Sequence, residues 1–182
     1  MESSTSSPQN NEYWENRLIN DPKKDWDEEG DWIEQYWGSR FHSHRFLMIE
    51  KLRRLMPITN LLEIGCNCGP NLWVIGGMFE NVRLFGIDVN KDAIERGKQK
   101  VPFADLKVAA VENIPYFNKS FDVVLSDAVL IYVGPNKIEG AIEEMIRVAK
   151  RAIILVEWFD ENLLGTIKDF HWARNYPKLF DK

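Results

Sequence analysis

Cysteine is scarce in this sequence: only Cys66 and Cys68 occur in 182 residues. Two cysteines separated by a single residue form a strained disulfide. No other cysteine is present to complete a zinc-binding set. We therefore predict two reduced thiols within a tight turn and no metal site. Reduced thiols are typical of cytoplasmic proteins.

Long apolar runs are also absent. No stretch reaches the roughly 18 consecutive apolar residues that a membrane-spanning helix requires. The first eleven residues, MESSTSSPQNN, have neither the basic start nor the apolar run of a secretion signal. These observations predict a cytoplasmic protein with no membrane partner. Because residues 1–11 offer no apolar anchor, we predict a disordered tail there.

An excess of positive charge is lacking too. The net charge is -5 and the sequence pI is about 5.3, which argues against a nucleic-acid partner because phosphates require a basic surface. Ten acidic and four basic residues lie in residues 1–40, so the remainder is nearly neutral. We expect a solvated face in the N-terminal segment, with an acidic docking patch as the alternative.

What is present is an ordinary globular composition, 45% hydrophobic, at a length that favours one domain. Residues 12–37 are rich in aromatic side chains and predict one or two short helices, interrupted at Asp21-Pro22. Residues 39–55 carry apolar side chains three and four apart, which predicts an amphipathic helix. We expect residues 12–56 to form a helical lid that belongs to one globular unit with residues 57–182.

Strands and helices alternate after residue 57. Short apolar runs predict five strands, and helical spacing predicts the segments between them. The predicted strands are 61–64, 82–88, 106–110, 121–126 and 152–156; the predicted helices begin at Pro70 and span 91–100 and 137–149. This alternation predicts an α/β fold with a Rossmann-like, doubly wound, mostly parallel sheet of about five strands and helices on both faces.

The turn after the first predicted strand carries the chemistry. It reads Glu63-Ile-Gly-Cys-Asn-Cys-Gly-Pro-Asn71. Gly65 and Gly69 allow a ligand to approach the backbone, and Asn67 tolerates left-handed backbone angles. The helix that begins at Pro70 points its free N–H groups at this turn.

Asp88 ends the second predicted strand, 19 residues after Gly69. A carboxylate at this spacing is placed to accept hydrogen bonds from two ribose hydroxyls, and it repels a 2′-phosphate. The glycine pattern of dinucleotide-binding turns matches at one position of three. A pattern of an acid followed by three alternate glycines matches at three of four, at Glu63, Gly65 and Gly69. The Glu63 carboxylate suits an ammonium group, so a nucleoside that carries an amino acid fits better than a dinucleotide.

Together these features resemble the class I S-adenosylmethionine-dependent methyltransferases, over roughly residues 40–158. The resemblance rests on the glycine turn and on four further segments. These are Ile87-Asp-Val-Asn90, Glu112-Asn-Ile-Pro115, the run from Ser120 to Leu130, and Glu144-Met-Ile-Arg-Val148.

The resemblance implies S-adenosylmethionine as cofactor and a role for each matching residue. The turn residues Glu63, Gly65, Cys66, Asn67 and Gly69 would surround the methionine half. Asp88 would hold the ribose and Val89 would pack on the adenine. Ala110, Val111 and Glu112 would lie at the adenine edge, and Ser126, Asp127 and Ala128 beneath the sulfonium. A helix cap is the alternative role for Asp127.

Three features depart from the family pattern: two residues and the length of the C-terminal segment. Asn67 replaces the middle glycine, and Ala110 stands where an aspartate is common. The largest departure is that only 24 residues follow Trp158, too few for the helix and two strands that usually complete this sheet. Either the sheet stops at five strands or the chain is truncated. The fifth strand is then an exposed edge that either residues 159–182 or a second subunit would cover; the second alternative is a homodimer through this edge.

The predicted lid offers contacts to the cofactor. Arg40, or else Arg45, would pair with the methionine carboxylate, and Tyr36 or Trp37 would face the sulfonium. Simple packing of the aromatic helix on the sheet is the alternative. Candidate general bases are His42, His44, His171, Tyr132 and Glu157, among which the sequence does not choose.

The predicted function is methyl transfer from S-adenosylmethionine to a small-molecule acceptor. Because the last two strands are missing, the alternative function is that of a non-catalytic module. Such a module would bind S-adenosylmethionine or S-adenosylhomocysteine and would need a partner to complete its sheet. A nicotinamide oxidoreductase is a third alternative, which the glycine spacing disfavours.

Overall fold

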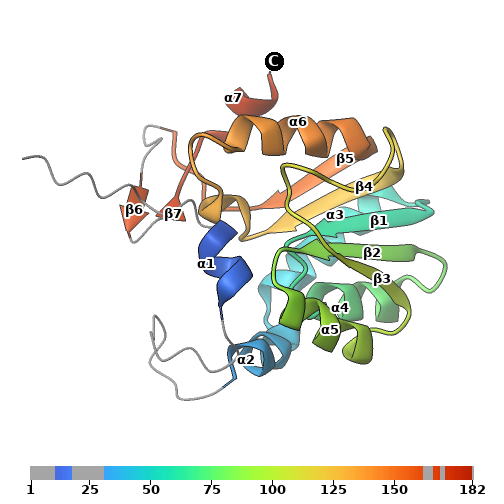
Figure 1. The fold of residues 1–182 in the computed structure, drawn as a ribbon. Helices are drawn as coiled ribbons and strands as arrows, with labels where there is room; N and C mark the ends of the chain where they lie inside the picture. The colour runs from blue at the N-terminus through green and yellow to red at the C-terminus, as the bar shows by residue number, and fades with distance from the viewer. Residues whose placement is uncertain (1–10, 18–30, 162–165, 169–170, 182) are drawn as a thin grey trace, which may run out of the picture.

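The computed structural model describes residues 11–17, 31–161, 166–168 and 171–181 of the chain (Figure 1). The predicted tail lies outside this part except for Asn11. The interruption predicted at Asp21-Pro22 also lies outside it.

A five-stranded, all-parallel sheet forms the centre of the molecule, in the order β3-β2-β1-β4-β5. The strands are β1 (Asn60–Ile64), β2 (Arg83–Asp88), β3 (Ala104–Val108), β4 (Phe121–Asp127) and β5 (Ala149–Val156). The predicted fold class is confirmed. The predicted strands differ from the observed ones by up to three residues at their ends, most at the start of β5.

Helices cover both faces of the sheet. The helices α3 (His44–Leu55), α4 (Pro70–Met78) and α5 (Lys91–Lys100) share one apolar core with β1, β2 and β4. On the opposite face, α6 (Ile138–Val148) buries Ile142 and Met145 against Leu62 and Val124. Figure 1 shows α6 on one side of the sheet and α4 and α5 on the other.

The predicted helix over residues 39–55 is broken. A 3₁₀ turn, η1 (Ser39–Phe41), comes first, and α3 begins only at His44. Between them His42 has an extended backbone, with φ -64° and ψ 140°. The apolar spacing did not reveal this break, because the apolar positions before and after it remain three to five residues apart.

Two short helices precede the break, α1 (Asn11–Asn16) and α2 (Trp32–Gly38). Arg96 of α5 holds α2 through ion pairs with Asp31, at 2.6 Å, and Glu34, at 2.9 Å. Asn90, which caps the start of α5, donates from Nδ2 to the Trp14 carbonyl at 2.7 Å and so holds α1. Both N-terminal helices are therefore attached to the segment that follows β2.

The chain after β5 adds no strand to the main sheet among the described residues. A separate antiparallel pair, β6 (Thr166–Lys168) and β7 (His171–Trp172), is followed by α7 (Tyr176–Phe180). Ile167, predicted to lie in a helix or loop, is in β6, whereas Leu163, Leu164 and Phe170 lie outside the described part. In that part β5 pairs only with β4, so its other edge carries no strand.

No helix in the described part of the chain has the length and apolar character needed to cross a bilayer.

Candidate active site

The turn between β1 and α4 has the backbone conformation that its sequence predicts. Gly65, Asn67 and Gly69 have φ values of 63°, 50° and 84°, all in the left-handed region. A Cβ atom on Gly65 would lie 2.3 Å from Val129 Cγ2, so this turn packs directly against the segment after β4. Glycine is therefore required at position 65 for both conformation and space.

Both cysteines of the turn are buried and free. Burial raises the pKa of the Cys66 thiol well above its ordinary value and that of Cys68 to about 12. Because the thiolate is the reactive form, these side chains act as small packing residues at neutral pH.

A cavity opens at the carboxyl ends of the strands, where parallel sheets bind their ligands. Gly65 and Asn67 line it after β1, Asp88 and Val89 at the end of β2, and Asp127 at the end of β4. Ala109 and Val111, which follow β3, complete this wall. The wall thus brings together residues from four separate strand ends.

Aromatic side chains form the opposite wall. Trp14 of α1, Trp32 and Tyr36 of α2, and Tyr132 of η2 (Leu130–Tyr132) line the same cavity. The Trp14 ring lies 5.8 Å from that of Trp32 and 5.0 Å from that of Tyr132, both edge to face. The N-terminal helices α1 and α2 therefore contribute side chains to the cavity at the strand ends.

Asp88 is held by the turns around it. One carboxylate oxygen accepts the Asn67 N–H at 2.8 Å and the other accepts the Asn90 N–H at 2.8 Å. Burial raises the pKa of the Asp88 carboxyl. Each carboxylate oxygen can accept more than one hydrogen bond, so acceptor capacity remains for a ligand in the cavity.

Glu63 lies deeper and does not line the cavity. It is 2% exposed; its Oε1 accepts the Asn71 Nδ2 at 2.6 Å, and its Oε2 is buried with no hydrogen-bond partner. Burial raises the pKa of Glu63 to about 8. Asn71 Nδ2 also lies 3.0 Å from Asp127 Oδ2, which connects Glu63 to the cavity wall.

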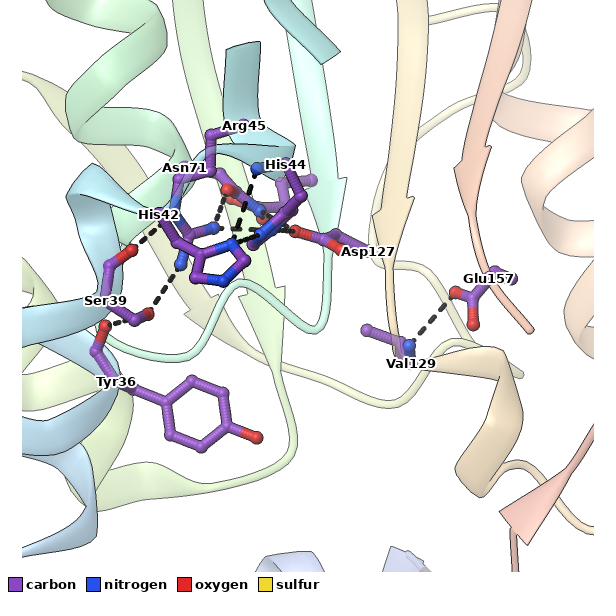
Figure 2. A network of polar contacts seen from close by, with 10 residues as sticks. Tyr36, Ser39, His42, His44, Arg45, Asn71, Asp127, Val129 and Glu157 are labelled. Atoms are coloured by element: carbon purple, nitrogen blue, oxygen red, sulfur yellow. Dashed lines mark hydrogen bonds and ion pairs between the residues drawn. The ribbon is translucent and has the colours of Figure 1, made fainter. Parts of the chain in front are cut away.

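Arg45 completes a polar network with these residues (Figure 2). Its guanidinium donates to the Ser39 hydroxyl at 2.8 Å, to Asn71 Oδ1, and to Asp127 Oδ2 at 3.5 Å. His44 Nε2 lies 2.9 Å from the same Asp127 oxygen. Asp127 is therefore the point at which the network reaches the cavity.

The η2 segment is held at both ends. Glu157, just after β5, accepts the Ser126 hydroxyl at 2.6 Å and the N–H groups of Val129 and Leu130 at 3.0 and 3.1 Å. Burial raises the pKa of Glu157 to about 6. Arg174 donates to the Leu130 and Val133 carbonyls at the other end of η2.

The structure brings about half of the predicted site residues to the cavity. Those that line it are Tyr36, Gly65, Asn67, Asp88, Val89, Val111 and Asp127. Those that lie elsewhere are Arg40, Glu63, Cys66, Gly69, Glu112 and Ser126.

Arg40 and Glu112 have other contacts. Arg40 donates to the Trp37 carbonyl at 3.0 Å and stacks over the rings of Trp37, Phe41 and Trp73. Glu112 lies 3.3 Å from Lys137 Nζ. Arg45, the second candidate, is the arginine that reaches the network at Asp127.

Sequence reasoning did not identify three features of this site. Trp14 and Trp32 line the cavity, although only the aromatic enrichment of their segment was informative. Asn71 connects two carboxylates, yet nothing in the sequence distinguishes it from a surface amide. Arg174 is 44 residues from the carbonyl it binds, a separation at which local patterns carry no information.

Comparison with known protein families gives a match that covers about half of the chain. The family described as "Methyltransferase domain" matches residues 61–152, which span β1 to β5. No curated protein matches the chain.

Solved structures of low sequence identity share the fold. The YcgJ protein of Bacillus subtilis is 18% identical, with a TM-score of 0.57 over 66% of this chain and 53% of its own. A chain in the complex of the Haloferax volcanii Trm112 methyltransferase activator with a methyltransferase is 17% identical, with a TM-score of 0.66 over 82% and 71%.

A third structure is CalS10 of Micromonospora echinaspora, an amino pentose methyltransferase solved with S-adenosylmethionine bound. It is 16% identical, with a TM-score of 0.61 over 76% of this chain and 61% of its own. The chain thus spans about half to two thirds of the length of most of these structures.

Proposed function

The chain belongs to the methyltransferase-domain family, which uses S-adenosylmethionine, and from this premise we propose that it transfers a methyl group to a small-molecule acceptor. The observation that carries the proposal is the cavity that joins the half-buried Asp88 carboxylate to the ends of β1 and β4. The acidic charge of the chain favours a small acceptor over a nucleic acid. The free, buried thiols favour a cytoplasmic location.

The residues around the cavity fit S-adenosylmethionine. Asp88 would hold the ribose hydroxyls, because its carboxylate lines the cavity and is fixed by two backbone N–H groups. Gly65 has no side chain and lets the ligand approach the turn. Val89 and Val111 offer an apolar surface for the adenine.

The charged groups match the methionine half. S-adenosylmethionine carries a sulfonium and an ammonium, and Asp127 presents a carboxylate to the cavity. Behind it lies the unpartnered Oε2 of Glu63, a further source of negative potential when ionised. Arg45, 3.5 Å from Asp127, is our candidate for binding the methionine carboxylate.

When bound, S-adenosylmethionine supplies a methyl group that is already activated for displacement. The chain's own task is to align an acceptor with that group and to exclude water, and orientation alone contributes roughly 7–11 kcal/mol to such reactions. Trp14, Trp32 and Tyr36 cover the cavity and would exclude water.

Binding of S-adenosylhomocysteine tests this function. A ligand that binds only the folded state raises the melting temperature. We expect such a shift for the wild-type protein. Asp88→Asn should weaken the binding at least about tenfold, because hydrogen bonds to a charged group contribute about 1.5–3 kcal/mol.

The matched control is Asp105→Asn on β3, a half-exposed carboxylate that does not line the cavity. It should bind like the wild type in calorimetry. The absence of any S-adenosylhomocysteine binding to the wild-type protein would contradict the proposed function.

A non-catalytic binding module is the second candidate, favoured by the fifth strand. Among the described residues β5 pairs on one side only, and residues 152–156 of this edge are apolar and half-buried. A second copy of the chain, or a partner such as the activator in the Haloferax volcanii complex, would then complete the sheet.

Two measurements separate these candidates. Transfer of a labelled methyl group from S-adenosylmethionine into a metabolite extract supports the enzyme, whereas binding without transfer supports the module. Light scattering that reports only monomers would contradict the homodimer.

A further inference from the structure

Three side chains form a continuous line from the cavity wall to the surface. His44 Nε2 lies 2.9 Å from Asp127 Oδ2, and His44 Nδ1 lies 2.7 Å from His42 Nδ1. Asp127 lines the cavity, His44 is one third exposed, and His42 is exposed. The rings of the two histidines lie 4.8 Å apart.

The hydrogen-bond donors and acceptors along this line of three side chains indicate which imidazole nitrogens carry protons. A carboxylate only accepts hydrogen bonds, so His44 donates from Nε2–H; in the neutral form of His44, Nδ1 then carries a lone pair. The 2.7 Å contact then requires His42 to donate from Nδ1–H. In this tautomer His42 Nε2 carries a lone pair and is available as a base.

A competing arrangement is present but weaker. The backbone N–H of His44 also approaches His42 Nδ1, at 3.4 Å, and a hydrogen bond there would reverse the tautomer of His42. That distance lies beyond the usual range for N–H donors, whereas 2.7 Å lies within it. The side-chain contact therefore decides the tautomer.

The backbone break determines how the His42 ring is directed. His42 is the extended residue between η1 and α3, so its ring does not follow the direction of the helix. Figure 2 shows the ring between Ser39 and Asp127, with its outer edge on the side of Tyr36. Tyr36 and Asp127 both line the cavity; His42 itself does not line it and is connected to it through His44 and Asp127.

We propose that His42 is the general base of the methyl transfer, positioned by His44 and Asp127, and that the acceptor carries a proton on its nucleophilic atom. This inference rests on the proposed function. Hydroxyl, phenol and amine acceptors belong to this class, whereas thioether acceptors do not.

The step balances with the groups present. The acceptor lone pair forms a bond to the methyl carbon, and the electrons of the broken carbon–sulfur bond remain on sulfur. The acceptor proton moves to His42 Nε2. The resulting imidazolium releases the proton to solvent, because His42 is exposed.

The charged neighbours of the pair are few. Asp127 of β4 lies 2.9 Å from His44, and Arg45 of α3 contacts the same carboxylate at 3.5 Å and also donates to Asn71. Tyr36 of α2 faces the same space. Asp127 is thus the group that orients His44.

Self-methylation tests the position of His42 without knowledge of the acceptor. In His42→Cys, an introduced thiol at this position should accept the methyl group of added S-adenosylmethionine, and peptide mass spectrometry would locate the product at position 42. Ser43→Cys is the matched control, because Ser43 is the exposed neighbour and its side chain makes no capping hydrogen bond. Cys66 and Cys68 are buried and should stay unmodified.

The outcomes are distinct. Methylation at position 42 but not at 43 supports the proposal. No methylation at 42, in a variant that still binds S-adenosylhomocysteine like the wild type, overturns it and leaves the proposed function standing. Equal methylation at both positions also overturns it. If the wild-type protein binds no S-adenosylhomocysteine, both proposals fall.

Nitrogen-15 NMR tests the tautomer in the unmodified protein, so this result does not depend on whether a variant folds. At about pH 8, where model imidazoles are neutral, we expect Nδ1–H on His42 and Nε2–H on His44. His44→Phe keeps a ring at position 44 but removes both hydrogen bonds, so His42 should become a tautomer mixture. Nε2–H on wild-type His42 would overturn the proposal.

Discussion

The two walls of the cavity are built in different ways. The sheet wall consists of turns directly after strands, and Gly65 and Asn67 hold left-handed backbone angles there. The lid wall consists of Trp14, Trp32 and Tyr36, which reach the cavity from helices held by side-chain packing and ion pairs rather than by strand ladders. Strand ladders hold the first wall, so it opens only with the core. We expect the second wall to open at a lower free-energy cost than the first.

Among substitutions in the two walls, Gly65→Ala should lower the stability of the protein most, because it changes the sheet wall itself. The added Cβ would meet Val129 at 2.3 Å in a backbone conformation that favours glycine. Backbone strain and overpacking each cost about 1–3 kcal/mol. We expect the free energy of unfolding to fall by about 2–5 kcal/mol, with loss of S-adenosylhomocysteine binding.

Gly77→Ala in α4 is the control, because a Cβ there has no atom within 4 Å. In a helix this change should be neutral or stabilising by up to about 1 kcal/mol. Equal melting temperatures for the wild type and Gly65→Ala would contradict the rigidity of the sheet wall.

Glu63 should make the sheet wall sensitive to pH. Folded Glu63 holds its proton to about pH 8, whereas the carboxyl ordinarily releases it near pH 4.5. The resulting stabilisation is complete below about pH 4.5 and is lost as the pH rises to about 8. Between pH 6 and 8 the free energy of unfolding should fall about 1–2 kcal/mol more for the wild type than for Glu63→Gln.

Urea unfolding at several pH values measures this difference. Glu80→Gln removes an exposed carboxylate and should keep the wild-type profile. Identical pH profiles for the wild type and Glu63→Gln would show that Glu63 is ionised in the folded protein.

Arg96→Ala should have the smallest effect, and it concerns the lid alone. It removes the ion pairs of α5 with Asp31 and Glu34, which at this exposure contribute no more than about 1 kcal/mol. Hydrogen exchange should become faster in α2 while the rates in β1 and β4 stay unchanged. Lys98→Ala is the control, because Lys98 pairs within α5 with Glu95. Equally faster hydrogen exchange in α2, β1 and β4 of Arg96→Ala would contradict the independence of the two walls.

Local sequence patterns were sufficient to predict the sheet wall. Alternating strands and helices predicted the parallel sheet, and the strand predicted over residues 82–88 placed Asp88 at the end of β2. The left-handed angle at Asn67 followed from the properties of asparagine. These features depend on residues close together in the chain, so a single sequence contains the information for them.

Long-range contacts were not predictable in the same way. Arg40 was the first candidate for the cofactor carboxylate, yet it stacks on Trp73, whereas Arg45 reaches Asp127. The two arginines are five residues apart, and the helix break at His42 determines their directions. No pattern in the segment distinguishes them.

The sequence by itself determined the order of strands and helices, the turn that needs residues without bulk, and the carboxylate at the end of β2. Each of these follows from the backbone preferences and burial of neighbouring residues. Only the tertiary structure decided which side chains of residues 12–56 meet the strand ends and how Asp127, His44 and His42 align. The contact between His44 and Asp127 joins residues 83 positions apart, and only the packing of α3 on the sheet brings them within hydrogen-bond distance.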